Sequence, residues 1–389
     1  MNMVEILEKL EAKMERLLNF LPKRKRLYFE NLEKFENEKG LLIYGPRGVG
    51  KTTYLLIASK KHNFFYLSGD DPLLSYISLY ELSERVFLEG FDGIIVDEVH
   101  YLNNWSLEIK SLYDFFPDKK IWISDSSSII LRKGISDLSR RFVKVKLPLL
   151  SFREYLYFET GQKIDKISSP FEFDREYVIS LTKNLEILKH FKNYSSSGTR
   201  PFYIEDNFSE KMKNVLEKTI YSDIPYFLES VKGNHLRLMR AILSYLIYSK
   251  IPTINVESMC KKWSVGKTKL YELLHVMQES EIINIVNKKG NFKVNSKGDK
   301  IFLSDPAYYY IYDGEIGNSR EAFVVFALKE IGEVYSAKDE NDSDFVFNDI
   351  KIEVGGRNKK IKNSDFVIRD DLDIPIKNRI PIWILGLLW

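Results

Sequence analysis

The sequence predicts an α/β fold with a parallel sheet of five strands, and two observations support this prediction. Apolar runs alternate with amphipathic helical stretches as far as Pro148, which is typical of parallel strands joined by crossover helices. The first run leads into a glycine-rich segment, and the third ends in two acidic residues. The strands are expected at residues 41–44, 64–67, 94–97, 121–125 and 143–147.

The glycine-rich segment reads GPRGVGKTT and follows the first expected strand directly. Its spacing, G-x-x-x-x-G-K-[ST], suits a loop whose backbone N–H groups surround a phosphate, because glycine permits the required dihedral angles. Lys51 would reach the β- and γ-phosphates, the Thr52 hydroxyl would bind Mg²⁺, and the following helix would add its positive dipole end. The alternative is a turn that binds nothing. The expected nucleotide-binding residues are Gly45, Pro46, Arg47, Gly48, Val49, Gly50, Lys51, Thr52 and Thr53.

The third expected strand ends in Asp97 and Glu98, within GIIVDEVHYLNNW. Ligands of open α/β sheets bind at the carboxyl ends of the strands. We therefore expect Asp97 to hold Mg²⁺, usually through a water, and Glu98 to orient or deprotonate the attacking water. An apolar strand ending in two acids is common, but its position after the glycine-rich loop favours a site. The paired acid, together with the lack of an N-K-x-D motif, argues against a GTPase.

Polar residues at the end of the fourth expected strand extend this prediction. Ser124 or Ser126 could hydrogen-bond the attacking water or the γ-phosphate, or could cap the next helix. Arg140 and Arg141 follow in SDLSRRF, where either could act as an arginine finger for a neighbouring subunit or form a surface charge pair. A finger of this kind would require a homo-oligomer. The expected catalytic residues are Lys51, Glu98, Ser124 and Arg141.

The composition of the chain excludes several classes of protein. Its 389 residues, 44% hydrophobic and 29% charged, predict two or three globular domains and exclude general disorder. A net charge of +3 is too small for the whole protein to bind polyanions, so any DNA contact must be local. The single cysteine, Cys260, suits a reducing cytoplasm. The charged segment 1–21 is neither a secretion signal nor a membrane span, and it predicts an amphipathic helix packed on the body.

These motifs resemble those of the AAA+ ATPases, in particular a prokaryotic group abundant in archaea. Its members join an AAA+ module to a winged-helix region and a nuclease-like C-terminal domain. The resemblance covers roughly residues 20–389 and lies in GPRGVGKTT, IIVDEVHYLNNW, WISDSSS and RRFVKVKLPLLSFREYL, with TIYSDIP and FLSDPAYYYIYD as later landmarks. It implies ATP rather than GTP, with Mg²⁺. It also implies that Arg237 or Arg240 could be a second sensor of the γ-phosphate, the alternative being a solvated helix face.

The rest of the chain is expected to form a helical lid, a winged helix-turn-helix and a small α/β domain. In the winged helix, Leu270, Leu273, Leu274 and Met277 would form one buried stripe of the second helix. Its exposed side would carry Lys267, Lys269, His275 and Gln278. The segment EIINIVNKKGNFKVNS predicts a β-hairpin with Lys288, Lys289 and Lys293 near its tip. Such a unit can place a helix in the DNA major groove or dock a protein. The expected domains are 1–158, 159–234, 235–304 and 305–389.

The last expected domain contains an acidic set that resembles the skeleton of PD-(D/E)xK nucleases. Its members are Glu321, Asp344 and Glu353, but the lysine required two residues after the glutamate is replaced by Gly355. Lys359 and Lys360 lie further along and would have to fold back. We therefore expect no metal-dependent DNA cleavage. The closing IPIWILGLLW predicts a buried edge strand or a subunit contact and is too short to span a membrane.

Taken together, these patterns predict a cytoplasmic ATPase with no membrane contact. It would bind and hydrolyse Mg-ATP, release ADP, and couple the reaction to a conformational change acting on DNA or a protein partner. Two alternatives stay open: an ATP-binding regulatory switch with little turnover, and an ATP-gated nuclease.

Overall fold

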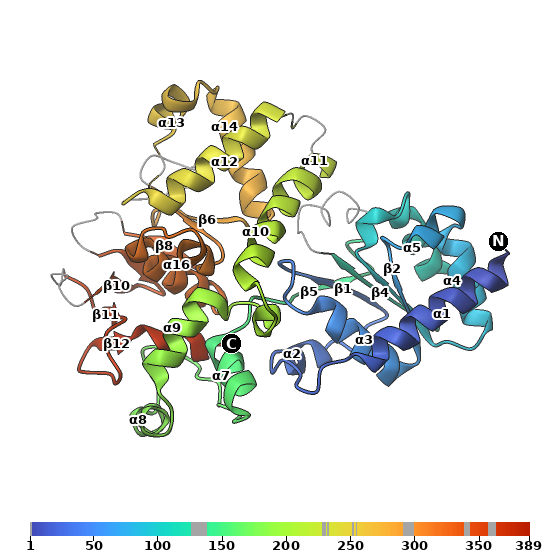
Figure 1. Ribbon diagram of the computed structural model, residues 1–389, viewed down its shortest axis with the longest axis horizontal. Coiled ribbons are helices and arrows are strands. Elements are labelled where there is room, and N and C mark those ends of the chain that lie inside the picture. The colour runs from blue at the N-terminus through green and yellow to red at the C-terminus, as the bar shows by residue number, and fades with distance from the viewer. Residues whose placement is uncertain are drawn as a thin grey trace. The chain divides into compact units, whose positions relative to one another are not determined.

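In the computed structural model, the chain divides into two units, Met1–Pro148 and Leu149–Trp389 (Figure 1). The structure describes residues 2–125, 138–227, 231, 233–250, 253, 255–290, 299–337, 343–356 and 363–389. Four residues discussed above therefore lie outside the described residues: Ser126, Lys293, Lys359 and Lys360. None of the described helices is both long and apolar enough to cross a membrane.

A parallel sheet of five strands forms the core of the first unit, as the sequence predicts. The strand order is β2-β3-β4-β1-β5, and every adjacent pair is parallel. Most residues of these strands are apolar because helices cover the faces of such a sheet. The strands are β1 (Gly40–Tyr44), β2 (Phe64–Ser68), β3 (Gly93–Asp97), β4 (Lys120–Asp125) and β5 (Val143–Lys146).

Helices and short 3₁₀ turns precede and connect the strands of the first unit. They are α1 (Met3–Asn19), α2 (Phe29–Glu33), α3 (Lys51–His62), η1 (Pro72–Tyr76), α4 (Leu79–Leu88), η2 (Val99–Tyr101) and α5 (Trp105–Phe115). The predicted N-terminal helix is α1, which begins with a capping box between Asn2 and Glu5 and contacts β2, α3 and α4. Its buried face comprises Ile6, Leu7, Leu10 and Met14.

The second unit begins with helices that pack through aromatic side chains. α7 (Phe152–Thr160) belongs here, since the rings of Phe152 and Tyr155 lie 5.4 and 5.7 Å from that of Tyr194. The boundary between the two units, at Pro148, differs from the end of the first predicted domain at residue 158. The division of the remaining chain at residues 234 and 304 stays a prediction. The next helices are α8 (Arg175–Asn184), α9 (Ile187–Ser197), η3 (Pro201–Ile204), α10 (Phe208–Lys218), the π-turn η4 (Thr219–Asp223) and α11 (Ile224–Phe227).

Three helices and a pair of antiparallel strands follow in the second unit. They are α12 (Gly233–Tyr248), α13 (Val256–Trp263), α14 (Lys267–Glu279), β6 (Ile283–Val286) and β7 (Lys300–Leu303). A turn with Ser264 in the left-handed conformation joins α13 to α14. The predicted apolar stripe of α14 is fully buried. The partner strand begins at Lys300, beyond the segment 281–296 in which the hairpin was predicted.

A mixed sheet with the order β12-β11-β10-β9-β8 ends the second unit. The strands of this sheet are β8 (Val334–Ser336), β9 (Phe345–Phe347), β10 (Ile350–Gly355), β11 (Phe366–Arg369) and β12 (Arg379–Pro381). The helices of this part of the chain are α15 (Ala307–Ile311), α16 (Ile316–Lys329) and the 3₁₀ helix η5 (Ile382–Leu387). The closing segment is an edge strand only in β12, and its larger part is the 3₁₀ turn η5. Trp383 and Trp389 are buried within this chain. The closing segment therefore exposes no apolar surface through which it could contact another subunit.

Candidate functional site

The loop between β1 and α3 takes up backbone conformations that favour glycine. The φ angles of Gly45, Gly48 and Gly50 are 148°, 76° and 95°. At Gly45, an added Cβ atom would lie 2.2 Å from the backbone oxygen of Leu147. Any side chain at this position would therefore displace the loop from β5. The loop has the conformation that the motif predicts.

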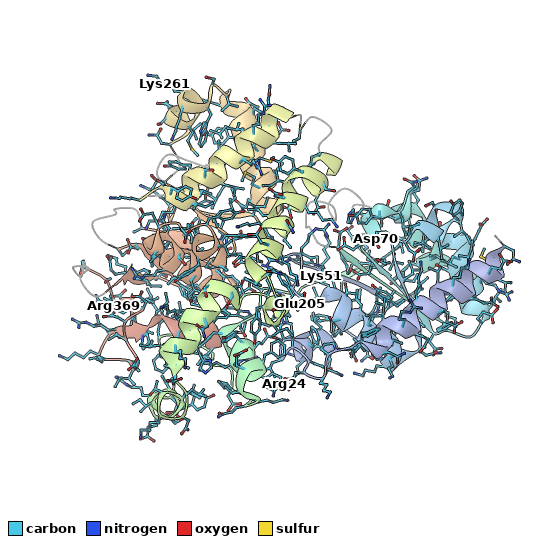
Figure 2. All side chains as sticks on the ribbon, viewed as in Figure 1. Arg24, Lys51, Asp70, Glu205, Lys261 and Arg369 are labelled. Carbon is cyan, nitrogen blue, oxygen red and sulfur yellow. The ribbon has the colours of Figure 1, made fainter. Side chains whose placement is uncertain are left out.

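Lys51 is the first residue of α3, and its ammonium group is buried (Lys51 is labelled in Figure 2). Its Nζ donates hydrogen bonds of 2.8 and 2.9 Å to the backbone oxygens of Gly45 and Pro46. Within the described residues it forms no ion pair with a carboxylate. Burial lowers the pKa of Lys51, although the negative charges of Glu98 and Asp97 act in the opposite direction. A buried cation held only by carbonyl groups is a suitable partner for an anionic ligand.

The N-terminus of α3 adds a second positive feature beside this ammonium. Gly50 is its N-cap and provides no side-chain hydrogen bond, and the first turn carries no acidic residue. The first N–H groups of a helix have no partner within it and carry the positive end of the dipole. The first turn of α3 is thus left open to an anion.

Asp97 ends β3 and lies at the centre of a hydrogen-bond network. Its Oδ2 accepts a 2.6 Å hydrogen bond from the hydroxyl of Thr52 and a 2.9 Å bond from the hydroxyl of Tyr66. Its Oδ1 accepts the hydroxyl of Ser124 and the backbone N–H of Glu98. Burial, and next the negative charge of Asp97, raise the pKa of Tyr66, so Tyr66 remains a donor. The two predicted metal-binding residues, Thr52 and Asp97, are therefore in contact.

Glu98 follows Asp97 in an unusual backbone conformation, with φ at 50°. Left-handed conformations are uncommon for residues other than glycine and often occur at functional sites. The Oε2 of Glu98 lies 3.4 Å from Nη2 of Arg47 and 3.9 Å from Nδ1 of His100. Burial raises the pKa of the Glu98 carboxyl above its ordinary 4.5, and the nearby charges of Arg47 and Lys51 lower it in part.

A buried histidine and aspartate lie next to this carboxylate. Nδ1 of His100 is 3.1 Å from Oδ2 of Asp125, and both residues are almost inaccessible to solvent. Asp125 ends β4, which lies between β3 and β1 in the sheet. The pair therefore connects the strand that carries Ser124 to the segment that carries Glu98.

Arg26, Tyr66 and the pair His100 and Asp125 belong to this site but were not identified from the sequence. The guanidinium of Arg26 donates 2.8 Å hydrogen bonds to the backbone oxygens of Val49 and Pro148, so it supports the loop from behind. Neither Tyr66, in a buried strand, nor Arg26, upstream of the first strand, lies in a sequence pattern that indicates a role at this site. A histidine two residues after Glu98 was the one available hint.

Ser124 and Arg141 are described, but their predicted roles stay predictions. Ser124 lies within β4 and is buried, and its hydroxyl contacts Asp97. Arg141 makes two 2.8 Å hydrogen bonds to the carboxylate of Asp114 in α5, and these lower the pKa of Asp114. This pairing agrees with the charge-pair interpretation of Arg141. The neighbouring Arg140 has an exposed side chain.

The two candidate sensor arginines lie on α12 in the second unit. Arg240 donates a 2.8 Å hydrogen bond to Glu217, and its guanidinium lies 5.1 Å from the ring centroid of Tyr221. Arg237 is exposed. Both observations agree with a solvated helix face, and the sensor role stays a prediction.

The hairpin of the second unit is attached to the mixed sheet. The backbone N–H of Ser336 donates to Asn287, and that of Lys289 donates to Ser336. The ammonium of Lys289 forms an ion pair with Asp349. On α14, His275 is exposed, as is Lys267, which lies 3.5 Å from Glu257, while Lys269 contacts Glu272. The helix thus presents polar groups, but Lys289 already has an acidic partner.

The acidic set of the second unit encloses a lysine that the sequence pattern did not indicate. Nζ of Lys300, at the start of β7, lies 2.7 Å from Oε2 of Glu321 and 3.5 Å from Oδ1 of Asp344. It also lies 4.6 Å from the ring centroid of Phe345. No group of three or more histidine, cysteine, aspartate or glutamate residues suited to a metal ion occurs among the described residues. Lys300 therefore neutralises two members of the acidic set.

The sheet order, the glycine-rich loop and the acidic pair place the first unit in the P-loop class of α/β nucleotide-binding domains. Residues 37–156 match the family described as "AAA domain". This part of the chain is therefore similar in sequence to AAA domains. The match covers the loop, both acidic residues and the start of α7.

Two curated relatives and two solved structures are similar to the larger part of the chain. An uncharacterized protein of Methanocaldococcus jannaschii is 29% identical over 308 residues, covering 71% of this chain and 64% of the relative. This chain thus spans less than two thirds of that relative. An uncharacterized ATP-binding protein of the same organism is 25% identical over 312 residues, covering 72% and 82%. A Walker-type ATPase of Pyrococcus abyssi is 16% identical with a TM-score of 0.41, covering 76% and 99%. A RuvB variant of Thermotoga maritima is 14% identical with a TM-score of 0.31, covering 78% and 94%.

Proposed function

We propose that the first unit binds ATP with Mg²⁺ and hydrolyses it to ADP and phosphate. The observation that carries this proposal is the buried ammonium of Lys51, which two backbone oxygens hold at the mouth of the glycine-rich loop. The phosphates of a nucleotide would supply the counter-charge that this ammonium lacks. The name of one relative, an ATP-binding protein, supports ATP as the nucleotide.

The residues around Asp97 suit a magnesium ion. Mg²⁺ prefers oxygen ligands and keeps several waters, and it would be held by the Thr52 hydroxyl and by Asp97 directly or through water. The ion would neutralise charge on the phosphates. Tyr66 and Ser124 donate hydrogen bonds to Asp97, so they fix the orientation of its carboxylate.

Glu98 is the residue best suited to the attacking water. Its Oε2 is buried and accepts no hydrogen bond from the described residues, which leaves it available to orient a water or accept its proton. Arg47 lies within ion-pairing distance and favours the charged form of the carboxylate, which partly opposes the effect of burial on its pKa. His100, held by Asp125, borders the same oxygen.

The second unit is the proposed recipient of the conformational change. Within it, the helices α12, α13 and α14 and the strands β6 and β7 follow one another in the order of a winged helix-turn-helix, in which α14 would be the recognition helix. Lysines on α14 and in the hairpin support DNA as the partner, whereas the ion pair of Lys289 with Asp349 supports a protein-docking role. An ATP-binding switch with little turnover is the second candidate function. The observation that favours it is the ion pair of Arg141 with Asp114, because Arg141 is a candidate arginine finger for a neighbouring subunit.

Nucleotide binding and turnover test this proposal directly. We expect wild-type protein to bind labelled ATP and release phosphate, and Lys51→Ala to abolish binding because it removes the ammonium at the β- and γ-phosphates. Lys60→Ala is the matched control, since Lys60 lies on the same helix with an exposed side chain. Near wild-type affinity in Lys51→Ala would refute the site.

The same assay separates the two candidate functions. An ATPase turns over many times per subunit, whereas a switch releases phosphate only slowly after tight binding. The rate measured with and without duplex DNA, and the mass in ATP and in ADP, would show whether DNA or self-assembly stimulates the enzyme.

A further inference from the structure

An arginine within the glycine-rich loop contacts the carboxylate that is proposed to act on the attacking water. Arg47 lies between Pro46 and Gly48, and Nη2 of its guanidinium is 3.4 Å from Oε2 of Glu98, the residue that follows β3. Only 12% of the Arg47 side chain and 20% of the Glu98 side chain are exposed. Arginine side chains are mostly exposed in folded proteins. The guanidinium of Arg47 is therefore directed toward the site rather than into solvent.

The contact between Arg47 and Glu98 is an ion pair without a direct hydrogen bond. Oε2 of Glu98 is buried and accepts no hydrogen bond from the described residues. The distance of 3.4 Å is longer than the roughly 2.7–2.9 Å of a charge-assisted hydrogen bond. A guanidinium group presents its N–H donors in a planar fork that matches carboxylate and phosphate oxygens alike. A phosphate bound at this loop would therefore compete with Glu98 for the same guanidinium.

Two positive charges lie close together at this loop. The ammonium of Lys51 is held by the backbone oxygens of Gly45 and Pro46. Burial lowers the pKa of Lys51, and the neighbouring positive charge of Arg47 also acts to lower it, so the two cations repel each other. A ligand with several negative charges would compensate both cations at once. The pair thus favours a polyphosphate over an anion of single charge.

The contact with Glu98 indicates which phosphate Arg47 would meet. In the proposed reaction, Glu98 orients the water that attacks the γ-phosphate of ATP. Such a water lies about 3 Å from both the general base and the phosphorus that it attacks. The γ-phosphate is therefore the part of the nucleotide nearest to Oε2 of Glu98. A guanidinium at ion-pairing distance from that oxygen borders the γ-phosphate rather than the α- or β-phosphate.

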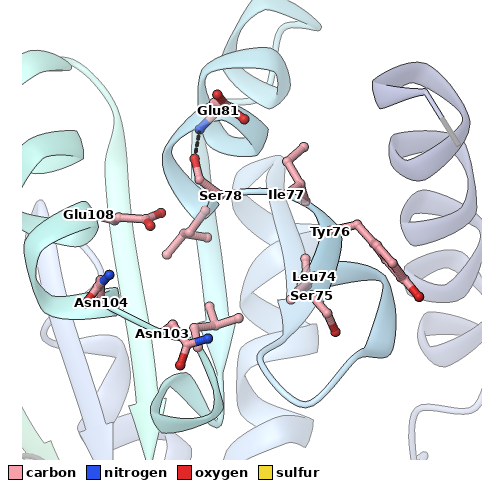
Figure 3. Close-up of a pocket in the computed structure, with 11 residues that line it drawn as sticks. Leu74, Ser75, Tyr76, Ile77, Ser78, Glu81, Asn103, Asn104 and Glu108 are labelled. Atoms are coloured by element: carbon pink, nitrogen blue, oxygen red, sulfur yellow. Dashed lines mark hydrogen bonds between the residues drawn. The ribbon is translucent and has the colours of Figure 1, made fainter.

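A separate pocket of the first unit does not suit a phosphate. It has a volume of about 350 Å³ and lies between η1 with the start of α4 and the segment that leads into α5 (Figure 3). Its lining includes Glu81 and Glu108, and the described residues that line it include no lysine or arginine. Acidic residues without a neighbouring cation disfavour an anion. The phosphates are therefore expected at the loop that carries Arg47 and Lys51.

We propose that Arg47 binds the γ-phosphate of ATP and leaves Glu98 to do so. Arg47 has two alternative partners in this scheme: the carboxylate of Glu98, as observed, and the γ-phosphate in the ATP complex. ADP lacks the γ-phosphate and leaves the ion pair in place. Glu98 thus loses its ion-pair partner only when a triphosphate is bound. This inference rests on the proposed function, because it requires ATP at the glycine-rich loop.

Titration calorimetry of the full-length protein with Mg²⁺ tests the inference, with ADP and the non-hydrolysable β,γ-imido analogue of ATP as ligands. We expect Arg47→Gln to weaken binding of the analogue by about tenfold to a hundredfold, the usual effect of losing a hydrogen bond to a charged group. The affinity for ADP should stay nearly unchanged. Arg47→Lys keeps the charge but not the planar fork, so it should restore part of the preference for the analogue.

Arg16→Gln is the matched control, because Arg16 is exposed on α1 and the substitution removes the same charge. It should leave both affinities unchanged. The urea midpoint of each variant shows whether the fold is retained. If Arg47→Gln is unstable, Arg47→Lys decides the question, since it should still lower the affinity for the analogue more than the affinity for ADP.

An equal loss of affinity for the analogue and for ADP would overturn the inference, because Arg47 would then support the loop as a whole. Unchanged affinity for both ligands would also overturn it, and a fall in turnover in the same variant would show that Arg47 acts only through Glu98. Wild-type protein that binds neither nucleotide would refute the proposed function and this inference together. Wild-type protein that binds both ligands, with no selective loss in Arg47→Gln, would refute the inference alone.

Discussion

The hydroxyl of Thr52 donates a 2.6 Å hydrogen bond to the carboxylate of Asp97. Thr52 lies in the first turn of α3 and Asp97 at the end of β3, and β4 separates β3 from the strand that precedes α3. Parallel pairing on both sides of β4 brings the two side chains to the same edge of the sheet. The proposed metal ligands therefore meet because of the strand order, and a metal would replace a hydrogen bond rather than require a backbone movement.

Glu98→Gln should preserve ATP binding and lower the turnover rate by roughly 10²–10⁴, the usual contribution of a positioned general base. The amide has almost the same shape as the carboxylate but cannot accept the proton of the water. Labelled-ATP binding and phosphate release measure the two effects separately. Glu89→Gln, at the exposed end of α4, is the control. A variant at position 98 that turns over at the parental rate would remove Glu98 from the chemistry.

The first sheet could be predicted closely from the sequence. Each of its strands begins and ends within one residue of the predicted position, because runs of apolar residues bounded by polar ones define buried parallel strands. The glycine-rich loop could be predicted equally well, because the residues that define it are consecutive in the sequence. The contact of His100 with Asp125 could not be predicted, because it joins residues 25 positions apart and depends on which strands are neighbours.

The second unit shows the same limit of sequence interpretation. The buried stripe of α14 follows from helical spacing and is confirmed at Leu270, Leu273, Leu274 and Met277. The partner of β6 was placed too early, since strand pairing is set by tertiary register rather than by local pattern. The nuclease pattern requires a lysine close in sequence to Glu353, and Gly355 occupies that position. The lysine that contacts the acidic set is Lys300, which lies in a different sheet and could not be identified from local sequence.

Arg140→Ala is expected to lower the turnover rate by on the order of 10³ or more and leave nucleotide affinity intact, if an exposed arginine serves a neighbouring subunit. Arg140 is the better candidate because Arg141 is held by Asp114. The rate per subunit should also rise with protein concentration. Turnover that is independent of concentration, in a protein of monomeric mass, would reject the role.

Arg141→Ala serves as the comparison for the arginine finger. Its removal breaks an ion pair that is partly solvent-exposed, so we expect a small loss of stability and nearly unchanged turnover. A collapse of turnover in this variant, with Arg140→Ala unaffected, would reverse the assignment of the two arginines.

Duplex DNA should bind the full-length protein in a salt-sensitive manner if α14 and the hairpin contact phosphates. Neutral glutamine at Lys288, Lys289 and Lys293 should weaken binding for all sequences. The slope of log affinity against log salt should fall by roughly 0.9 for each lost phosphate contact. Fluorescence anisotropy over a salt series measures both quantities.

Three exposed lysines elsewhere in the second unit provide the matched control for DNA binding: Lys166, Lys183 and Lys192. Their replacement by glutamine changes the net charge equally and should leave the slope unchanged. Equal losses in both triple variants would indicate general charge attraction. No binding at low salt would favour a protein partner for α14.

The last prediction concerns Lys300, which we expect to stabilise the second unit rather than assist metal-dependent DNA cleavage. Lys300 is buried against Glu321 and Asp344, and removing one partner of a buried ion pair typically costs about 3–5 kcal/mol of unfolding free energy. Lys300→Met should therefore lower the urea midpoint of this unit, and adding Glu321→Gln and Asp344→Asn should restore part of the loss, because no unpaired charge then remains buried. The full-length protein should release no products from duplex, single-stranded or branched DNA with Mg²⁺ or Mn²⁺, since the cation near the acidic set neutralises two of its members. Products that disappear in Asp344→Ala and in Lys359→Ala would contradict this expectation and make the ATP-gated nuclease the leading function.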